Sequence, residues 1–159
     1  MKTKILFVCL GNICRSPAAE AIFLFKLKEK HLLDKFQVDS AGTGGWHAGS
    51  FADSRMRKSA LKRGVVIESV ARQITLDDFN KFDLILTMDN SNLDDVKDLS
   101  SQLVSPFKAQ IEPIVQFAKN TNFLEVPDPY YGGDKGFDEV LDLLEDAING
   151  LILYIISKT

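Results

Sequence analysis

The segment Ile5-Leu6-Phe7-Val8-Cys9-Leu10-Gly11-Asn12-Ile13-Cys14-Arg15-Ser16-Pro17 lies near the start of the chain and predicts three successive elements. Its apolar run at residues 5–8 predicts a buried strand. The glycine and asparagine that follow predict a tight loop, and the Ser-Pro pair predicts the start of a helix. The segment therefore predicts a loop that joins the end of a buried strand to the N-terminus of a helix.

This loop places the thiol of Cys9 and the guanidinium of Arg15 close together in the chain. A helix N-terminus carries free backbone N–H groups and the positive end of the helix dipole, so it attracts anions. Arg15 adds planar donors that can bind two phosphate oxygens at once. The same positive groups would hold Cys9 as a thiolate, the nucleophilic form of cysteine. The loop therefore predicts phosphoryl transfer through a cysteine.

Each part of the loop also has a purely structural interpretation. Cys9 could be a small core residue at the end of a strand, and Ser16 with Pro17 is an ordinary pair for the first turn of a helix. The combination of Cys, Gly, Asn, Arg and Ser at these positions has no common packing reason. We therefore favour the catalytic interpretation.

Strand-like and helical segments alternate along the rest of the chain. The expected strands are residues 5–8, 36–40, 84–86 and 109–111. The expected helices are residues 16–30, a helix capped by Asp53 and ended by Gly64, and a C-terminal amphipathic helix with apolar residues from 137 to 155. This alternation predicts an α/β fold with a central parallel sheet flanked by helices on both faces, of Rossmann-like type. Ligands bind such folds beyond the C-terminal ends of the strands, where the Cys9 loop lies.

Five motifs, in order along nearly the whole chain, resemble those of the low-molecular-weight protein tyrosine phosphatases. They are residues 8–19, 39–43, 71–73, 88–89 and 128–132. The loop from cysteine to arginine is shared with other phosphatase classes, but its position near the N-terminus together with a late Asp-Pro-Tyr-Tyr is more specific. The resemblance implies that phosphotyrosine-containing proteins are the substrates.

Asp128 is the candidate general acid that a cysteine phosphatase needs for the leaving oxygen. It stands between Pro127 and Pro129 in a rigid segment, although an Asp-Pro pair also forms ordinary turns. The resemblance equates Asp128 with the acid of the family. Arg15 and the backbone N–H groups of the phosphate-binding loop would hold the phosphate oxygens. The residues of this loop are Leu10, Gly11, Asn12, Ile13, Cys14 and Ser16.

The resemblance also implies roles around the loop. Ser16 matches a serine that donates to the nucleophilic sulfur, and Asn12 and Ser40 match residues that brace the loop. Ser69 stands where vertebrate members have a histidine, so we expect a thinner bracing network with an intact loop. Cys14 has two open interpretations, a reversible disulfide with Cys9 that protects the thiolate from further oxidation, or a small buried residue.

Apolar side chains are expected to form the walls of the substrate pocket. Leu10 and Ile13 would lie at the loop, and Trp46, Tyr130 and Tyr131 would form an aromatic slot over a phenyl ring. Three alternatives differ in their residues. Related arginine phosphatases carry threonine at the position of Ile13 and lack the paired tyrosines. Related arsenate reductases need further cysteines downstream. A non-catalytic phosphotyrosine or redox-sensing module would be favoured by the loss of Cys9 or Asp128.

Composition agrees with one phosphatase domain over residues 1–159. The chain is 45% hydrophobic and has a net charge of −3, which indicates neither a nucleic-acid nor a membrane-binding surface. Two cysteines confined to one loop fit a reducing compartment, and no signal peptide or membrane span is apparent, so we expect a cytoplasmic protein. We also expect a monomer. His31 and His47 are isolated and predict ordinary polar roles, so neither a metal nor another cofactor is expected.

Overall fold

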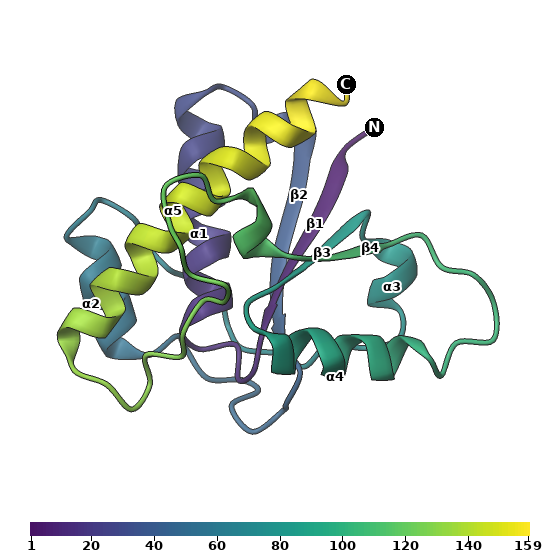
Figure 1. Ribbon diagram of the computed structural model, residues 1–159, viewed down its shortest axis with the longest axis horizontal. Helices are drawn as coiled ribbons and strands as arrows, with labels where there is room; N and C mark the ends of the chain where they lie inside the picture. The colour runs from purple at the N-terminus through teal and green to yellow at the C-terminus, as the bar shows by residue number, and fades with distance from the viewer.

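The computed structural model describes residues 1–159 and contains one four-stranded sheet (Figure 1). Its order is β2-β1-β3-β4, and all neighbouring strands are parallel. Because Val8 pairs with Ala41 on one side and Thr87 on the other, the C-terminal ends of three strands share one edge. The strands are β1 (Thr3–Cys9), β2 (Phe36–Gly42), β3 (Leu84–Thr87) and β4 (Gln110–Pro113).

Helices cover both faces of this sheet (Figure 1). Alternate side chains of β1 point to opposite faces, so Ile5 and Phe7 join a large core with α1, α2 and α5, and Leu6 and Val8 join a smaller core with α3 and α4. The helices are α1 (Arg15–Glu29), α2 (Ser54–Leu61), α3 (Asp78–Lys81), α4 (Asn90–Ser100) and α5 (Asp134–Ser157), with 3₁₀ turns at Leu33–Lys35 and Ile114–Phe117.

The predicted α/β fold class is confirmed, and all four expected strands are present. The Asp53 side chain caps α2 as predicted, but this helix ends at Leu61, and the chain then turns through Gly64 at a φ of +79°. The segments that form α3 and α4 were not predicted to be helical. Only Asn92 and Val96 of α4 are buried, so this helix carries too little apolar periodicity to be recognised. No helix combines the length and apolar character needed to cross a membrane.

Candidate active site

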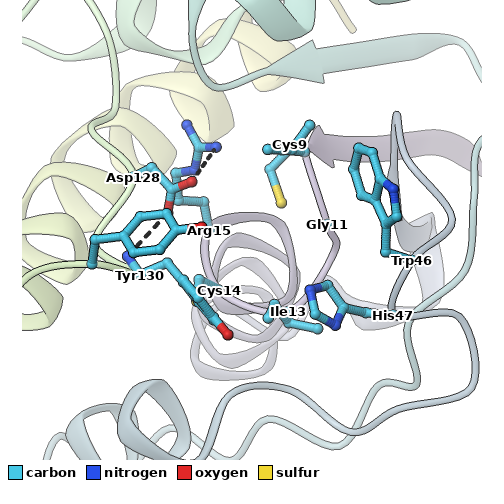
Figure 2. Close-up of a pocket in the computed structure, with 11 residues that line it drawn as sticks. Cys9, Gly11, Ile13, Cys14, Arg15, Trp46, His47, Asp128 and Tyr130 are labelled. Atoms are coloured by element: carbon cyan, nitrogen blue, oxygen red, sulfur yellow. Dashed lines mark hydrogen bonds and ion pairs between the residues drawn. The ribbon is translucent and has the colours of Figure 1, made fainter.

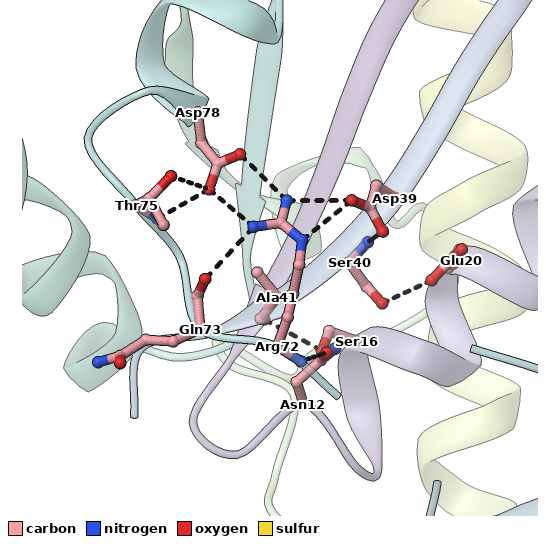
Figure 3. A network of polar contacts seen from close by, with 10 residues as sticks. All are labelled: Asn12, Ser16, Glu20, Asp39, Ser40, Ala41, Arg72, Gln73, Thr75 and Asp78. Atoms are coloured by element: carbon pink, nitrogen blue, oxygen red, sulfur yellow. Dashed lines mark hydrogen bonds and ion pairs between the residues drawn. The ribbon is translucent and has the colours of Figure 1, made fainter. Parts of the chain in front are cut away.

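The loop between β1 and α1 lies at the C-terminal edge of the sheet and depends on Asn12. Asn12 has a φ of +58°, in the left-handed region that asparagine tolerates better than most residues. Its side-chain Nδ2 donates to Ser16 Oγ (2.7 Å), and its Oδ1 accepts from the backbone N–H of Arg72 (3.0 Å) (Figure 3). The loop is therefore held by one contact from within and one from a distant segment.

Cys9 ends β1 with its sulfur directed into a cavity (Figure 2). A hydrogen bond of 3.0 Å joins Cys9 Sγ and Ser16 Oγ. Because Ser16 Oγ already accepts from Asn12, its own hydrogen is available to the sulfur, with the Ala41 carbonyl as a longer alternative acceptor at 3.4 Å. The Ser16 hydroxyl is thus placed to donate to the sulfur of Cys9. Ser16 thus occupies the place that the resemblance implies.

Arg15 is the most buried charged residue of the site, with 2% of its surface exposed. Its Nη1 donates to Asp89 Oδ2 (2.6 Å) and to the carbonyl of Val126 (3.0 Å), and its Nη2 lies 3.6 Å from Asp128 Oδ2. Burial opposes the charged guanidinium, but the negative charges of Cys9, Asp89 and Asp128 outweigh it and raise the pKa of Arg15 above its ordinary value. Arg15 is therefore a fixed cation.

Asp128 lies across the cavity from Cys9, in a segment with neither helix nor strand (Figure 2). Its Oδ1 accepts from the backbone N–H of Tyr130 (3.0 Å), and 38% of its side chain is exposed. The carboxyl group is thus held by a neighbouring peptide but open to the cavity.

The cavity has a volume of about 350 Å³ and gathers every predicted wall residue. Trp46 and Tyr130 lie on opposite sides of the opening, and Ile13 lies between Cys14 and His47 (Figure 2). His47, expected to have only an ordinary polar role, also lines the cavity, with its ring 6.4 Å from that of Tyr130. The lining residues are Cys9, Leu10, Gly11, Ile13, Cys14, Arg15, Trp46, His47, Asp128, Tyr130 and Tyr131.

Cys14 faces the same cavity in a different electrostatic environment. Burial, and then the negative charges of Asp53, Cys9 and Asp128, raise the pKa of Cys14 to about 12. The two thiols of the loop are therefore unequal, because Cys14 stays protonated near neutral pH.

Ser40, which was expected to brace the loop, contacts a carboxyl group behind it. Ser40 Oγ donates to Glu20 Oε1 (2.5 Å), as Figure 3 shows. Burial raises the pKa of Glu20 to about 7, although hydrogen bonds from Ser40 and Ser69 and the charge of Arg72 lower it. Ser40 makes no hydrogen bond with Asn12, whose side chain is occupied by Ser16 and Arg72.

Four residues near the site were not identified as site residues from the sequence: Glu20, His47, Arg72 and Asp89. Asp89 could have been found, because it follows the apolar β3 strand at the same edge of the sheet as the loop. Arg72 acts on the loop through its backbone N–H, which no residue pattern reveals. Throughout the chain, no group of three or more His, Cys, Asp and Glu side chains is arranged to hold a metal ion.

The chain is similar to known proteins along most of its length. The family model of low molecular weight phosphotyrosine protein phosphatases matches residues 4–159. The chain is 43% identical to a low molecular weight phosphotyrosine protein phosphatase of Gallus gallus, covering 87% of this chain and 86% of the relative.

Two solved structures have the same fold along nearly the whole chain. A protein tyrosine phosphatase from Entamoeba histolytica has a TM-score of 0.91 and 45% identity and covers 99% of both chains. A Drosophila arginine phosphatase also has a TM-score of 0.91, with 30% identity and 98% coverage of both chains. From the family model and these relatives, the chain belongs to the low molecular weight phosphotyrosine protein phosphatase family.

Proposed function

We propose that the protein hydrolyses phosphotyrosine in proteins through a phosphorylated Cys9, with Asp128 as general acid and base. The observation that carries this proposal is that a thiol, a buried guanidinium and an open carboxyl group converge on one cavity (Figure 2). A nucleophile, an oxyanion-binding group and a proton donor are the parts that this reaction requires.

In the first step, Cys9 Sγ attacks phosphorus in line with the tyrosyl oxygen. The bond between phosphorus and oxygen breaks while protonated Asp128 gives its proton to the leaving oxygen. Both hydrogen bonds of Arg15 come from Nη1, which leaves Nη2 and Nε to bind the equatorial phosphate oxygens. The products are tyrosine and a cysteinyl phosphate.

In the second step, a water molecule attacks the phosphorus of the cysteinyl phosphate. Asp128, now a carboxylate, takes a proton from this water, and the bond between sulfur and phosphorus breaks. Inorganic phosphate leaves, and Cys9 returns to the thiolate that Ser16 Oγ stabilises. The two steps use the same carboxyl group in opposite directions, and neither needs a cofactor.

The walls of the cavity support an aryl substrate. Trp46 and Tyr130 can contact the two faces of a phenyl ring, and Ile13 adds an apolar surface beside the loop. A short phosphoserine or phosphothreonine side chain would leave these surfaces unfilled.

Competing hydrolysis of different phosphopeptides tests this proposal. We expect phosphotyrosine peptides to have a much higher kcat/KM than peptides with phosphoserine, phosphothreonine or phosphoarginine. Ile13→Thr should raise the relative rate on phosphoarginine, because a hydroxyl can pair with a guanidinium that an apolar side chain leaves unpaired. A wild-type preference for phosphoarginine would favour the activity for which the Drosophila relative is named.

The two free thiols also support a reducing compartment for this protein. Both cysteines are unpaired, and the proposed nucleophile works only when reduced. We therefore infer a cytoplasmic protein, and a monomer, since its proposed site is built from one chain.

A further inference from the structure

The segment that carries Asp128 has no regular structure of its own. Residues 118–133 form neither helix nor strand between the 3₁₀ turn at Ile114–Phe117 and the start of α5. On the N-terminal side of Asp128, Val126 is anchored by a hydrogen bond from its N–H to the Met88 carbonyl (2.7 Å) and by the bond that its own carbonyl accepts from Arg15. The C-terminal side needs a separate anchor.

Arg55, at the start of α2, supplies that anchor. Its Nη2 donates to the backbone carbonyl of Tyr130 (3.0 Å). Its guanidinium carbon lies 5.3 Å from the centre of the Tyr130 ring and 4.7 Å from that of Phe137, within the range of cation–π contacts. Arg55 therefore contacts both the end of the irregular segment and the first turns of α5.

Tyr130 connects Arg55 to the candidate acid. The N–H of Tyr130 donates to Asp128 Oδ1, while its carbonyl accepts from Arg55. Holding this carbonyl limits the rotation of Tyr130, and so fixes the N–H that orients the carboxyl group. Neither Arg55 nor Tyr130 makes a hydrogen bond or ion pair with Cys9 or Arg15, and within this path only Asp128 reaches Arg15, at 3.6 Å.

The other side of Arg55 is tied to the loop itself. Arg55 Nε and Nη2 donate to the two carboxylate oxygens of Asp53 (3.1 and 2.9 Å), a paired geometry that fixes the guanidinium plane. The backbone N–H of Asp53 donates to the carbonyl of Ile13 (2.8 Å). Asp53 and Arg55 thus link the loop that carries the nucleophile to the segment that carries the acid.

We propose that Arg55 is a positioning residue that sets the distance and direction of Asp128 relative to the substrate oxygen. It touches neither Cys9 nor the phosphate, and the path by which we propose that it acts on the reaction runs through Tyr130 to Asp128, while its contact with Asp53 holds the guanidinium in place. This inference rests on the proposed role of Asp128 as general acid. Its consequence is specific, because losing Arg55 should impair protonation of the leaving group and leave phosphate binding intact.

The test measures kcat/KM for a series of aryl phosphates whose phenols differ in acidity. In Arg55→Met, the rate on phenyl phosphate should fall by on the order of tenfold to a hundredfold, the scale of a misplaced catalytic group. The rate on dinitrophenyl phosphate should barely change, because that phenolate leaves without a proton. In Asp128→Asn, kcat/KM should depend on the acidity of the phenol even more steeply than in Arg55→Met. The double variant should lose no more kcat/KM than Asp128→Asn alone.

Two further variants make the result specific. Arg55→Lys keeps a cationic donor for the Tyr130 carbonyl and should restore part of the rate on phenyl phosphate. If Arg55→Met does not fold, the same measurements are made on Arg55→Lys. Arg57→Met is the matched control, because Arg57 is on the same helix but donates to the Ala52 carbonyl (2.9 Å), and it should keep the wild-type dependence on the leaving group.

The outcomes separate this inference from the proposed function. An equal loss for all leaving groups in Arg55→Met, or losses that multiply in the double variant, would overturn the positioning role of Arg55 while leaving Asp128 as the acid. If the rate of Asp128→Asn depends on the leaving group no more steeply than that of wild type, Asp128 is not the acid, and both the proposed mechanism and the role of Arg55 are wrong.

Discussion

Cys9 and Cys14 belong to the same short loop, yet their surroundings give them different chemistry. Cys9 has the Ser16 hydroxyl at 3.0 Å and Arg15 beside it. Cys14 is surrounded by apolar atoms and by the negative charge of Asp53, which keep it a neutral thiol. A neutral thiol is a poor nucleophile toward phosphate, but it can still condense with an oxidised sulfur. The sequence identified Cys9 as the candidate nucleophile but left the role of Cys14 open, because the burial and the Asp53 charge that raise the pKa of Cys14 arise only in the folded chain.

We predict that Cys14 protects Cys9 from irreversible oxidation. Mild peroxide should convert Cys9 to a sulfenic acid, and the Cys14 thiol should then displace water to form a disulfide that a reducing agent reverses. Cys14→Ser should have normal activity before oxidation but recover much less of it afterwards, when Cys9 has passed to the sulfinic acid. Activity assays with mass spectrometry measure both quantities. Equal recovery in the two proteins would leave Cys14 as a small buried residue.

At the scale of elements, α1 and β2 share a half-buried carboxyl group behind the loop. Glu20 of α1 accepts from Ser40 of β2, and Ser40 follows Asp39, which pairs with Arg72 (Figure 3). Arg72 Nε donates to Asp39 Oδ2 (3.0 Å), and its other nitrogens donate to Asp78 (3.0 Å each). This network fixes the backbone N–H that Asn12 accepts, so the loop depends on a helix and a strand behind it.

Glu20 should make stability depend on pH. Its pKa is raised to about 7 in the folded protein, so between about pH 4.5 and 7 the folded state binds more protons than the unfolded state. The free energy of unfolding should therefore fall as the pH rises through this range. Glu20→Gln removes the charge that forms as the pH rises. The difference in free energy of unfolding between this variant and wild type should therefore shift in favour of the variant from about pH 4 to about pH 8, by on the order of 1–3 kcal/mol.

Urea denaturation at both pH values measures this difference. Glu29→Gln is the matched control, because it removes an exposed carboxyl group from the same helix. If wild type and Glu20→Gln keep a constant stability difference across the range, Glu20 is charged in the folded protein throughout, and burial does not govern its titration.

The elements that the sequence predicted are those with a strong apolar pattern. Every apolar residue expected to line the inner face of the C-terminal helix, from Phe137 to Ile155, is buried in α5. The short β1 strand was equally clear, because it is buried on both faces. By contrast, α4 is mostly polar, and its start is marked only by the reciprocal hydrogen bonds of Asp89 and Asn92. Such a capping pair is short and common, so it does not establish a helix alone.

For the whole molecule, sheet topology determines which distant residues meet. The parallel order places the end of β1 between the ends of β2 and β3, so the loop that begins at Cys9 lies beside Asp89, which follows β3. The irregular segment then crosses this edge and brings Asp128 to within 3.6 Å of Arg15. Sequence motifs identified the three chemical groups, but not the contacts that orient them. Those contacts run through backbone atoms of Arg72, Val126 and Tyr130, whose positions only the complete fold determines.

The most direct test of the account is to trap the phosphorylated enzyme. Radiolabelled dinitrophenyl phosphate is mixed with the Asp128→Asn enzyme, which should still form the intermediate from this activated substrate but hydrolyse it slowly for want of a base. After an acid quench and proteolysis, the account predicts one labelled peptide that carries phosphate on Cys9 Sγ, and no label in Cys9→Ser. Label on a histidine or carboxylate, or continued turnover by Cys9→Ser, would contradict it.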